Sequence, residues 1–252
     1  MGRKLGQHLL VRGSILRRIA DAVCRESGGL VIEIGPGAGA LTAHLLARCE
    51  RLIAVEVDQA MVARLQERFS GAANLEIIHA DILSMDIGDW GEVTVAGNLP
   101  YYITSPIIKQ TLELGPRLRR AVFLIQKEVA VRVTARPGTR DYSFLTLQTQ
   151  LYAEARVLFS VPPSAFRPPP KVDSAVVELS PRAQPLAAAP KEFLRFASAC
   201  FRHKRKTLRS NLKANWPAID DQREKSLRAE QLSIAELIDL HHRLTGQGIF
   251  GP

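Results

Sequence analysis

Short apolar runs alternate with helix-like stretches over the first two thirds of this 252-residue chain. The first run, Leu30–Ile34, is followed by a glycine-rich turn and by a helical pattern over Ala40–Arg48. Further runs follow at Leu52–Val57, Leu75–His79, Val93–Gly97 and Ala121–Ile125, with helical patterns at Met61–Phe69 and from about Ser105, where Pro106 is expected at the first helical position. Such alternation favours an α/β fold, with a parallel sheet covered by helices on both faces.

The last third of the chain has a different pattern. Two β-like runs, Ala155–Val161 and Ala175–Leu179, are expected to add an antiparallel hairpin at the edge of the sheet. Ser180–Pro190 is rich in proline and alanine and is typical of a linker, whereas Glu192–Leu244 is helical in pattern throughout. We therefore expect an α/β domain over residues 1–182 and a small all-α domain over residues 190–252.

The net charge of +9 indicates a polyanionic partner, and nucleic acid is a better candidate than an acidic membrane. No run has the ~20 apolar residues of a membrane span, and residues 1–7 lack the apolar core of a signal peptide. Cys24, Cys49 and Cys200 are far apart and form no Cys-x-x-Cys pair. We expect them to be small core residues in the reducing cytoplasm, with no disulfide and no metal site.

Polar and glycine residues follow the predicted strands where ligands bind in such sheets. Gly35 and Gly37 form a turn that a ligand can approach closely. Glu56 follows the second strand, where its carboxylate can accept both hydroxyls of a ribose. Asp81 follows the third, where it can accept a hydrogen bond from an adenine amine. Glu33 precedes the turn and can face a cationic amino acid group.

The turn alone is ambiguous. Gly35-x-Gly37-x-x-Ala40, with an acid after the next strand, also fits a dinucleotide-binding fingerprint and so leaves an NAD-dependent oxidoreductase as an alternative. Glu33 weighs against that alternative, and so does Asn98-Leu99-Pro100-Tyr101, which has no role in the fingerprint. This stretch joins an amide, a stiffened backbone and an aromatic face at a strand end, which suits a planar, amine-bearing base. A plain strand-to-turn junction is the simpler interpretation.

Several motifs together resemble the dimethyladenosine transferases of small-subunit (16S) ribosomal RNA, the KsgA/RsmA family of adenine N6-methyltransferases. They are Gly6–Leu10, Glu33–Gly37, Asn98–Tyr101, the proline-rich Val161–Val177 and the basic Phe201–Leu212, in register from residue 6 to about 212. The resemblance implies a Rossmann-like class I S-adenosylmethionine-dependent methyltransferase domain with a small all-α C-terminal domain. It also implies N6,N6-dimethylation of two adjacent adenines in the 3′-terminal hairpin of that RNA.

Carried over residue by residue, the resemblance assigns a role to each motif. The cofactor contacts would be His8, Leu10, Gly35, Gly37, Glu56, Asp81 and Asn98, although His8 stands where asparagine is usual. The Asn98 side chain and the Leu99 carbonyl would accept the adenine N6–H groups, with Pro100 fixing the backbone. Tyr101 would stack on the base and Phe166 would cover its other face, unless Phe166 is a core residue.

Arg202, Lys204, Arg205, Lys206 and Arg209 are the expected RNA-binding residues. On a helix, Arg202, Arg205 and Arg209 would share one face and neutralise phosphates. His241 and His242 are expected at the surface.

The expected partner is small-subunit ribosomal RNA in an assembling pre-30S particle, bound by a cytoplasmic monomer with no membrane contact. One alternative is a large-subunit (23S) enzyme of the macrolide-resistance type. Another is a non-catalytic RNA-binding factor on the same scaffold.

Overall fold

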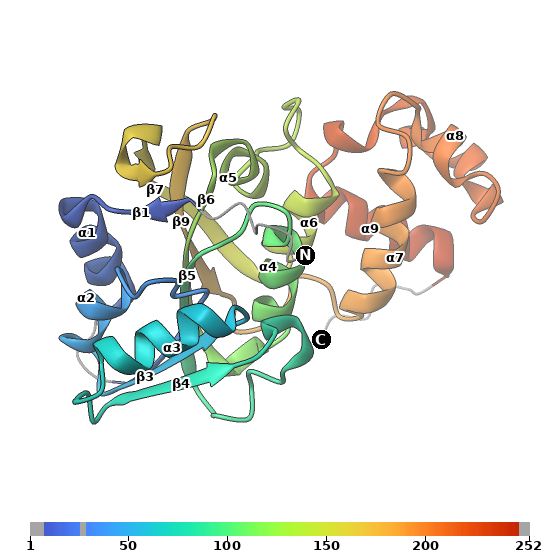
Figure 1. The fold of residues 1–252 in the computed structure, drawn as a ribbon. Coiled ribbons are helices and arrows are strands. Elements are labelled where there is room, and N and C mark those ends of the chain that lie inside the picture. The colour runs from blue at the N-terminus through green and yellow to red at the C-terminus, as the bar shows by residue number, and fades with distance from the viewer. Residues whose placement is uncertain (1–7, 26–28, 247–252) are drawn as a thin grey trace. The chain divides into compact units, whose positions relative to one another are not determined.

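The computed structural model describes residues 8–25 and 29–246 and divides into two compact units (Figure 1). One unit contains the described residues up to Ala130 together with Ala153–Ala183, and the other contains Val131–Tyr152 with the described residues from Gln184 onwards. Residues 131–152 thus group with the C-terminal helices rather than with the sheet, which differs from the predicted limits of 1–182 and 190–252. Among the described residues, no helix is long and apolar enough to cross a membrane.

A seven-stranded sheet forms the first unit. Its order is β4 (Leu75–His79), β3 (Arg51–Glu56), β2 (Leu30–Ile34), β5 (Val93–Asn98), β6 (Leu118–Gln126), β9 (Ser174–Pro181) and β7 (Ala153–Val161). The first five strands pair in parallel, and β9 pairs antiparallel with both β6 and β7. The predicted parallel sheet and its antiparallel edge hairpin are therefore confirmed.

The strand order reverses beside β2, which pairs with β3 on one side and with β5 on the other. Ile34 and Gly97 lie opposite each other at the C-terminal ends of β2 and β5. A Cβ atom on Gly97 would lie 2.5 Å from the Ile34 carbonyl oxygen, so only glycine permits this close pairing. Such a switch point is where open α/β sheets bind their ligands.

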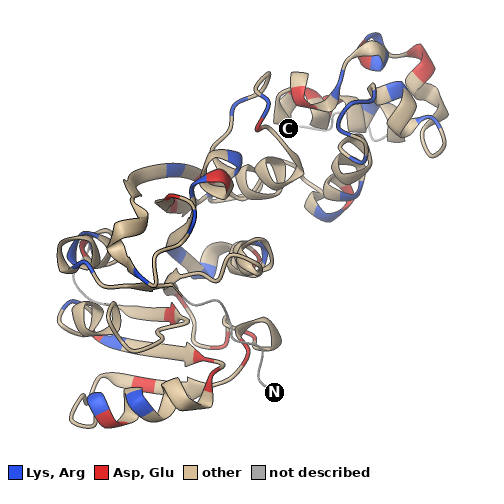
Figure 2. Cartoon of the chain, turned by 45° about the horizontal axis from the view of Figure 1, so that its top comes forward, with Lys and Arg blue, Asp and Glu red and all other residues tan. Residues whose placement is uncertain are grey.

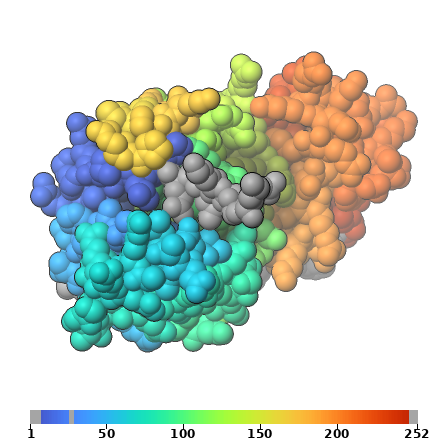
Figure 3. Space-filling view, in the orientation of Figure 1, coloured from blue at the N-terminus to red at the C-terminus, as the bar shows by residue number. Residues whose placement is uncertain are grey.

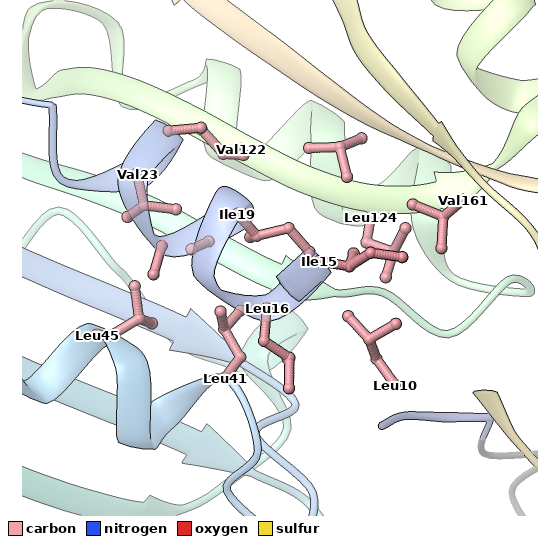
Figure 4. Packing of buried hydrophobic residues seen from close by; sticks show 14 of the residues in the cluster. Leu10, Ile15, Leu16, Ile19, Val23, Leu41, Leu45, Val122, Leu124 and Val161 are labelled. Carbon is pink, nitrogen blue, oxygen red and sulfur yellow. The ribbon is translucent and has the colours of Figure 1, made fainter. Parts of the chain in front are cut away.

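Two helices cover one face of the sheet. Figure 4 shows Ile15 and Ile19 of α1 (Gly13–Val23) directed at Val122 and Leu124 of β6, with α2 (Thr42–Leu46) beside them. Helix α1 was not predicted from the sequence, although the apolar residues of this segment recur at helical spacing.

Further helices complete the first unit. α3 (Gln59–Arg68) packs on β3 and β4, and α4 (Thr104–Leu112) packs on β6. Because α4 begins at Thr104, Pro106 is its third residue rather than its first. Short 3₁₀ turns lie at Ile82–Ser84, Gly115–Arg117 and Pro163–Ala165.

A two-stranded ladder fastens the beginning of the described chain. β1 (Leu9–Leu10) pairs antiparallel with β8 (Phe166–Arg167), and the Val11 N–H continues the pairing with the Ala165 carbonyl at 2.9 Å. In Figure 3 the yellow segment that contains β8 lies against the blue N-terminal residues. This ladder lies beside β5, because the Asn98 side chain at the end of β5 bonds the backbone of His8.

The second unit has its own apolar core, which includes Phe193, Phe196 and Leu237. Its helices are the end of α5 (Lys127–Val133), α6 (Phe144–Gln150), α7 (Pro190–Cys200), α8 (Leu208–Leu212) and α9 (Ile234–Thr245), joined by 3₁₀ turns at Pro217–Asp221, Arg223–Ser226 and Ala229–Gln231. The described residues from Glu192 to Leu244 form helices and 3₁₀ turns and no strand, in line with the predicted helical pattern, but loops interrupt them, as between Cys200 and Leu208. His241 is not a surface residue: it is 4% exposed and packs on Phe196, and burial lowers its pKa.

Candidate active site

A cavity opens at the C-terminal ends of β2, β3 and β5. It is lined by His8, Leu9, Ile34, Gly35, Gly37, Val55–Val57, Ala80–Ile82 and Asn98–Ile103. Figure 2 shows acidic residues at the tips of neighbouring strands at this edge of the sheet. The structure thus brings together most of the residues that the sequence proposed for the cofactor and for the base.

The glycine turn and Glu56 form one hydrogen-bonded unit. Gly35 and Gly37 have φ values of +65° and +56°, a region that favours glycine. The Gly37 N–H donates to Glu56 Oε2 at 3.0 Å, while Glu56 Oε1 accepts the N–H groups of Val57 and Asp58. The buried carboxylate is therefore held in a fixed position beside the turn.

Asp81 is exposed at the end of the loop that follows β4. Its Oδ1 accepts the Leu83 N–H at 3.0 Å and so caps the following 3₁₀ turn. Gln110 of α4 braces the same turn, because its Nε2 donates to the carbonyls of Ile82 and Met85, each at 2.8 Å. These contacts place an acidic side chain at the rim of the cavity.

Glu33 does not line the cavity, contrary to the expectation that it faces a cationic ligand group. Side chains two residues apart on a strand share a face, so Glu33 lies on the same side of β2 as Val31, facing the α1–α2 layer. There it is 2% exposed and accepts the Thr42 hydroxyl at 2.6 Å. Burial raises the pKa of the Glu33 carboxyl to about 7.

This raised pKa predicts a pH dependence of stability. The folded protein holds the Glu33 proton up to about pH 7, whereas the unfolded chain releases it near its ordinary pKa of 4.5. The free energy of unfolding should therefore fall by about 3 kcal/mol as the pH rises between these values, and then level off. Urea unfolding from pH 4.5 to 8 should show this fall reduced in Glu33→Gln. Identical pH profiles for the two proteins would contradict the prediction.

The Asn98 side chain has a defined orientation. Its Nδ2 donates to the main-chain carbonyl of His8 at 3.0 Å. Since a carbonyl only accepts, the atom facing it must be the nitrogen, and Oδ1 is the pole left to accept from a ligand. The following Leu99 N–H donates to the Leu124 carbonyl, and the Thr104 hydroxyl donates to the Pro100 carbonyl. The Asn98–Pro100 turn is therefore held on both sides.

Tyr101 is fixed at both ends of its side chain. Its hydroxyl lies 3.1 Å from the Ser174 hydroxyl, and its ring stacks on the ring of His8 with the centroids 5.9 Å apart. Tyr102 also lines the cavity but is 66% exposed.

Leu10 and Phe166 lie elsewhere, and for them the expected roles need correction. Both belong to the apolar core beside α1, where Leu10 is 4% and Phe166 is 1% exposed, and neither lines the cavity. They are directly opposite each other in the β1–β8 ladder, so their side chains project to the same side. Phe166 has no open face for a base here, and Leu10 none for a cofactor.

The basic residues do not form a helical stripe, which is a second correction. α7 ends at Cys200 and α8 begins only at Leu208, so Arg202, Lys204, Arg205 and Lys206 lie in an exposed loop. Lys204 donates to the Arg140 carbonyl at 2.6 Å. Arg209 is on α8 and pairs with Asp220 at 2.6 Å, and this pairing holds the pKa of the Asp220 carboxyl below its usual value.

The strand order and this cavity define a class I S-adenosylmethionine-dependent methyltransferase. The model of a family described as ribosomal RNA adenine dimethylase matches residues 1–244. The chain belongs to this family, and it is therefore an enzyme that uses S-adenosylmethionine.

Individual relatives agree with the family. The ribosomal RNA small subunit methyltransferase A of Geobacillus thermodenitrificans is 41% identical, over 96% of this chain and 90% of that protein. A solved dimethyladenosine transferase from Plasmodium falciparum is 27% identical, with a TM-score of 0.80 over 94% of this chain and 98% of that chain. The solved 23S rRNA methyltransferase ErmE is 29% identical, with a TM-score of 0.71 over 92% of this chain and 98% of that chain.

Proposed function

We propose that this protein transfers two methyl groups to N6 of each of two adjacent adenines in the 3′-terminal hairpin of small-subunit ribosomal RNA. We propose further that it acts in the cytoplasm, as a monomer, on an assembling pre-30S particle. The observation that carries the catalytic part is the Asn98 amide, whose Oδ1 is left as the acceptor at the cavity. The small-subunit substrate is supported by relatives of that name, which are more similar to this chain than the 23S enzyme is.

The cavity residues fit the cofactor. The turn at Gly35 and Gly37 offers backbone groups to the methionine end, and the Glu56 carboxylate offers an acceptor to the ribose hydroxyls. Gly37 is tightly placed, because a Cβ atom there would lie 3.2 Å from Leu9. Asp81 offers a carboxylate oxygen to the adenine amine from the rim. When bound, S-adenosylmethionine supplies an electrophilic methyl group on a sulfonium.

The Asn-Leu-Pro-Tyr turn then acts on the target base. The lone pair of an adenine N6 is delocalised into the ring, so the amine is a poor nucleophile. In the first transfer the Asn98 Oδ1 and the Leu99 carbonyl accept its two N–H groups and favour a pyramidal nitrogen whose lone pair points at the methyl. In the second transfer only one N–H remains for these two acceptors. Tyr101 offers a face for stacking, typically worth ~1–3 kcal/mol. The base must leave its stack to reach this cavity.

No general base is assigned, because the methylated ammonium product loses its proton readily to water. The chain's contribution is chiefly positioning, which can account for ~7–11 kcal/mol of a barrier when two reactants are well oriented.

We also propose that the domain limits lie near residues 182 and 190, and that the C-terminal helices contribute to RNA binding.

The loop after α7 provides a test of the RNA surface. Arg202, Arg205 and Lys206 are exposed and make no ion pair with any described residue, whereas the charge of Arg209 is already balanced by Asp220. Changing these three residues together to glutamine should reduce the slope of log K against log salt by roughly 2–3. Filter binding over a range of salt concentrations measures the slope. Arg209→Gln is the matched control and should change it less, while an unchanged slope in the triple variant would remove this loop from the RNA footprint.

Primer extension across ribosomal RNA tests the proposed substrate, because N6,N6-dimethyladenine cannot pair and stops reverse transcriptase. Deleting the gene should remove the stops in the 3′-terminal hairpin of 16S rRNA, and the wild-type gene should restore them. Stops that instead disappear from 23S rRNA would favour the large-subunit alternative. Unchanged stops in both RNAs, with no thermal stabilisation of the protein by S-adenosylmethionine, would favour the non-catalytic binding factor.

A further inference from the structure

His8 contacts both ends of the Asn98–Tyr101 turn. Its main-chain carbonyl accepts the Asn98 Nδ2–H at 3.0 Å, and its imidazole stacks on the Tyr101 ring at 29° between planes. His8, which directly precedes β1, therefore contacts both Asn98 and Tyr101, the two side chains that meet the target base in the proposed reaction.

His8 is itself held in place, both through its side chain and through the strand that follows it. His8 Nδ1 lies 2.8 Å from the Pro168 carbonyl oxygen, which only accepts, so the proton is on Nδ1. The next two residues pair with Arg167 and Phe166 in the β1–β8 ladder. The His8 carbonyl is thus held from its side chain and from the strand that follows it.

The direction of the Asn98 amide decides what it offers to a base. Because Nδ2 donates to the His8 carbonyl, Oδ1 is the amide atom left to bind the base. Oδ1 is a hydrogen-bond acceptor, which is what the N–H groups of an adenine amine require. In the flipped orientation Oδ1 would oppose the His8 carbonyl oxygen, and the amide would offer N–H donors to N–H donors. A dipole that is already oriented needs no reorganisation when the methyl group is transferred.

We propose that His8 is a positioning residue: its anchored carbonyl holds the Asn98 amide in the acceptor orientation, and its ring holds Tyr101 parallel to the bound base. This inference rests on the proposed function, and it gives the histidine of this chain a role besides the cofactor contact that the resemblance implies. The imidazole supplies both the Nδ1–H donor and the stacking ring.

Three substitutions separate these two parts. His8→Asn can keep a donor near Pro168 without the ring, His8→Phe keeps a ring without the donor, and His8→Ala removes both. We expect kcat to fall by roughly tenfold to a hundredfold in His8→Ala, and by less in the other two. The dissociation constant of S-adenosylmethionine should rise by a clearly smaller factor than kcat falls, since misorientation acts on the chemical step and the cofactor contact of His8 is one among several. His44→Ala, at a histidine of α2 outside the cavity, is the matched control.

A charge at position 98 gives a second test that needs no change at His8. In Asn98→Asp the carboxylate has no proton to donate to the His8 carbonyl, and Glu56 and Asp81 line the same cavity. Only its protonated form can restore the bond to His8. The activity of Asn98→Asp relative to wild type should therefore rise by about tenfold for each pH unit lowered, above the pKa of the new carboxyl. The wild-type profile corrects for any pH dependence that does not arise from the new carboxyl at position 98.

The outcomes divide clearly. Wild-type kcat in His8→Ala, equal losses of kcat and cofactor affinity, or an Asn98→Asp profile parallel to wild type would each overturn the role of His8. The ¹⁵N-labelled side-chain amide of Asn98 gives a readout without turnover: its protons should be protected from exchange in the wild type and lose protection in His8→Ala. If the wild-type enzyme methylates no ribosomal RNA adenine, the proposed function is wrong, and the amide signal still decides the role of His8.

Discussion

Asn98→Ala should lower kcat by roughly 10²–10³-fold while leaving the dissociation constant of S-adenosylmethionine nearly unchanged. The substitution removes the oriented acceptor for one N6–H group of the base. It leaves the glycine turn and the Glu56 carboxylate intact, because Glu56 is held by Gly37, Val57 and Asp58 rather than by Asn98. The two effects should therefore separate.

Single-turnover methylation of small-subunit ribosomal RNA measures the chemical step, and calorimetry measures cofactor affinity. Asn215→Ala is the matched control, since Asn215 is an exposed asparagine of the second unit. Turnover at the wild-type rate in Asn98→Ala would exclude the proposed mechanism. A loss of cofactor binding equal to the loss of activity would assign Asn98 to the cofactor alone.

The sheet could be predicted well from the sequence because its signals are local. A strand that is buried on both faces is a short, nearly continuous apolar run, and β2, which is buried from Val31 to Ile34, coincides with the predicted Leu30–Ile34. The edge strand β4 is partly exposed and coincides with the predicted Leu75–His79. The polar residues that follow such runs must gather at one edge of a parallel sheet. For this reason Gly35, Glu56, Asp81 and Asn98 line one cavity, as expected.

The expectations that needed correction depend on pairing between distant residues. Nothing local to Glu33 shows whether it faces the cavity or Thr42, since that follows from the packing of α2 on β2. Phe166 lies within a segment that resembles an RNA-modifying family, yet its direction is set by its partner Leu10, far away in sequence. The basic run after Cys200 satisfies a helical spacing, but Thr207 caps a new helix and leaves the preceding residues in a loop.

These long-range pairings also connect the core to the site. Phe166 lies opposite Leu10, and the same ladder holds His8, whose carbonyl bonds Asn98. A core residue can therefore influence the orientation of a cavity residue without touching the substrate. Loss of activity at Phe166 alone would not distinguish this indirect effect from stacking on a base, so stability must be measured as well.

Phe166→Ala should lower the free energy of unfolding by about 3–5 kcal/mol, because it removes a phenyl ring from a core in which Phe166 is 1% exposed. Urea unfolding monitored by circular dichroism measures the change. The matched control is Tyr102→Ala, where an aromatic side chain that is 66% exposed should contribute no more than about 0.5 kcal/mol. Phe166→Leu should recover much of the stability, since it refills most of the space. Unchanged stability in Phe166→Ala together with lost methylation would instead indicate that Phe166 stacks on the target base.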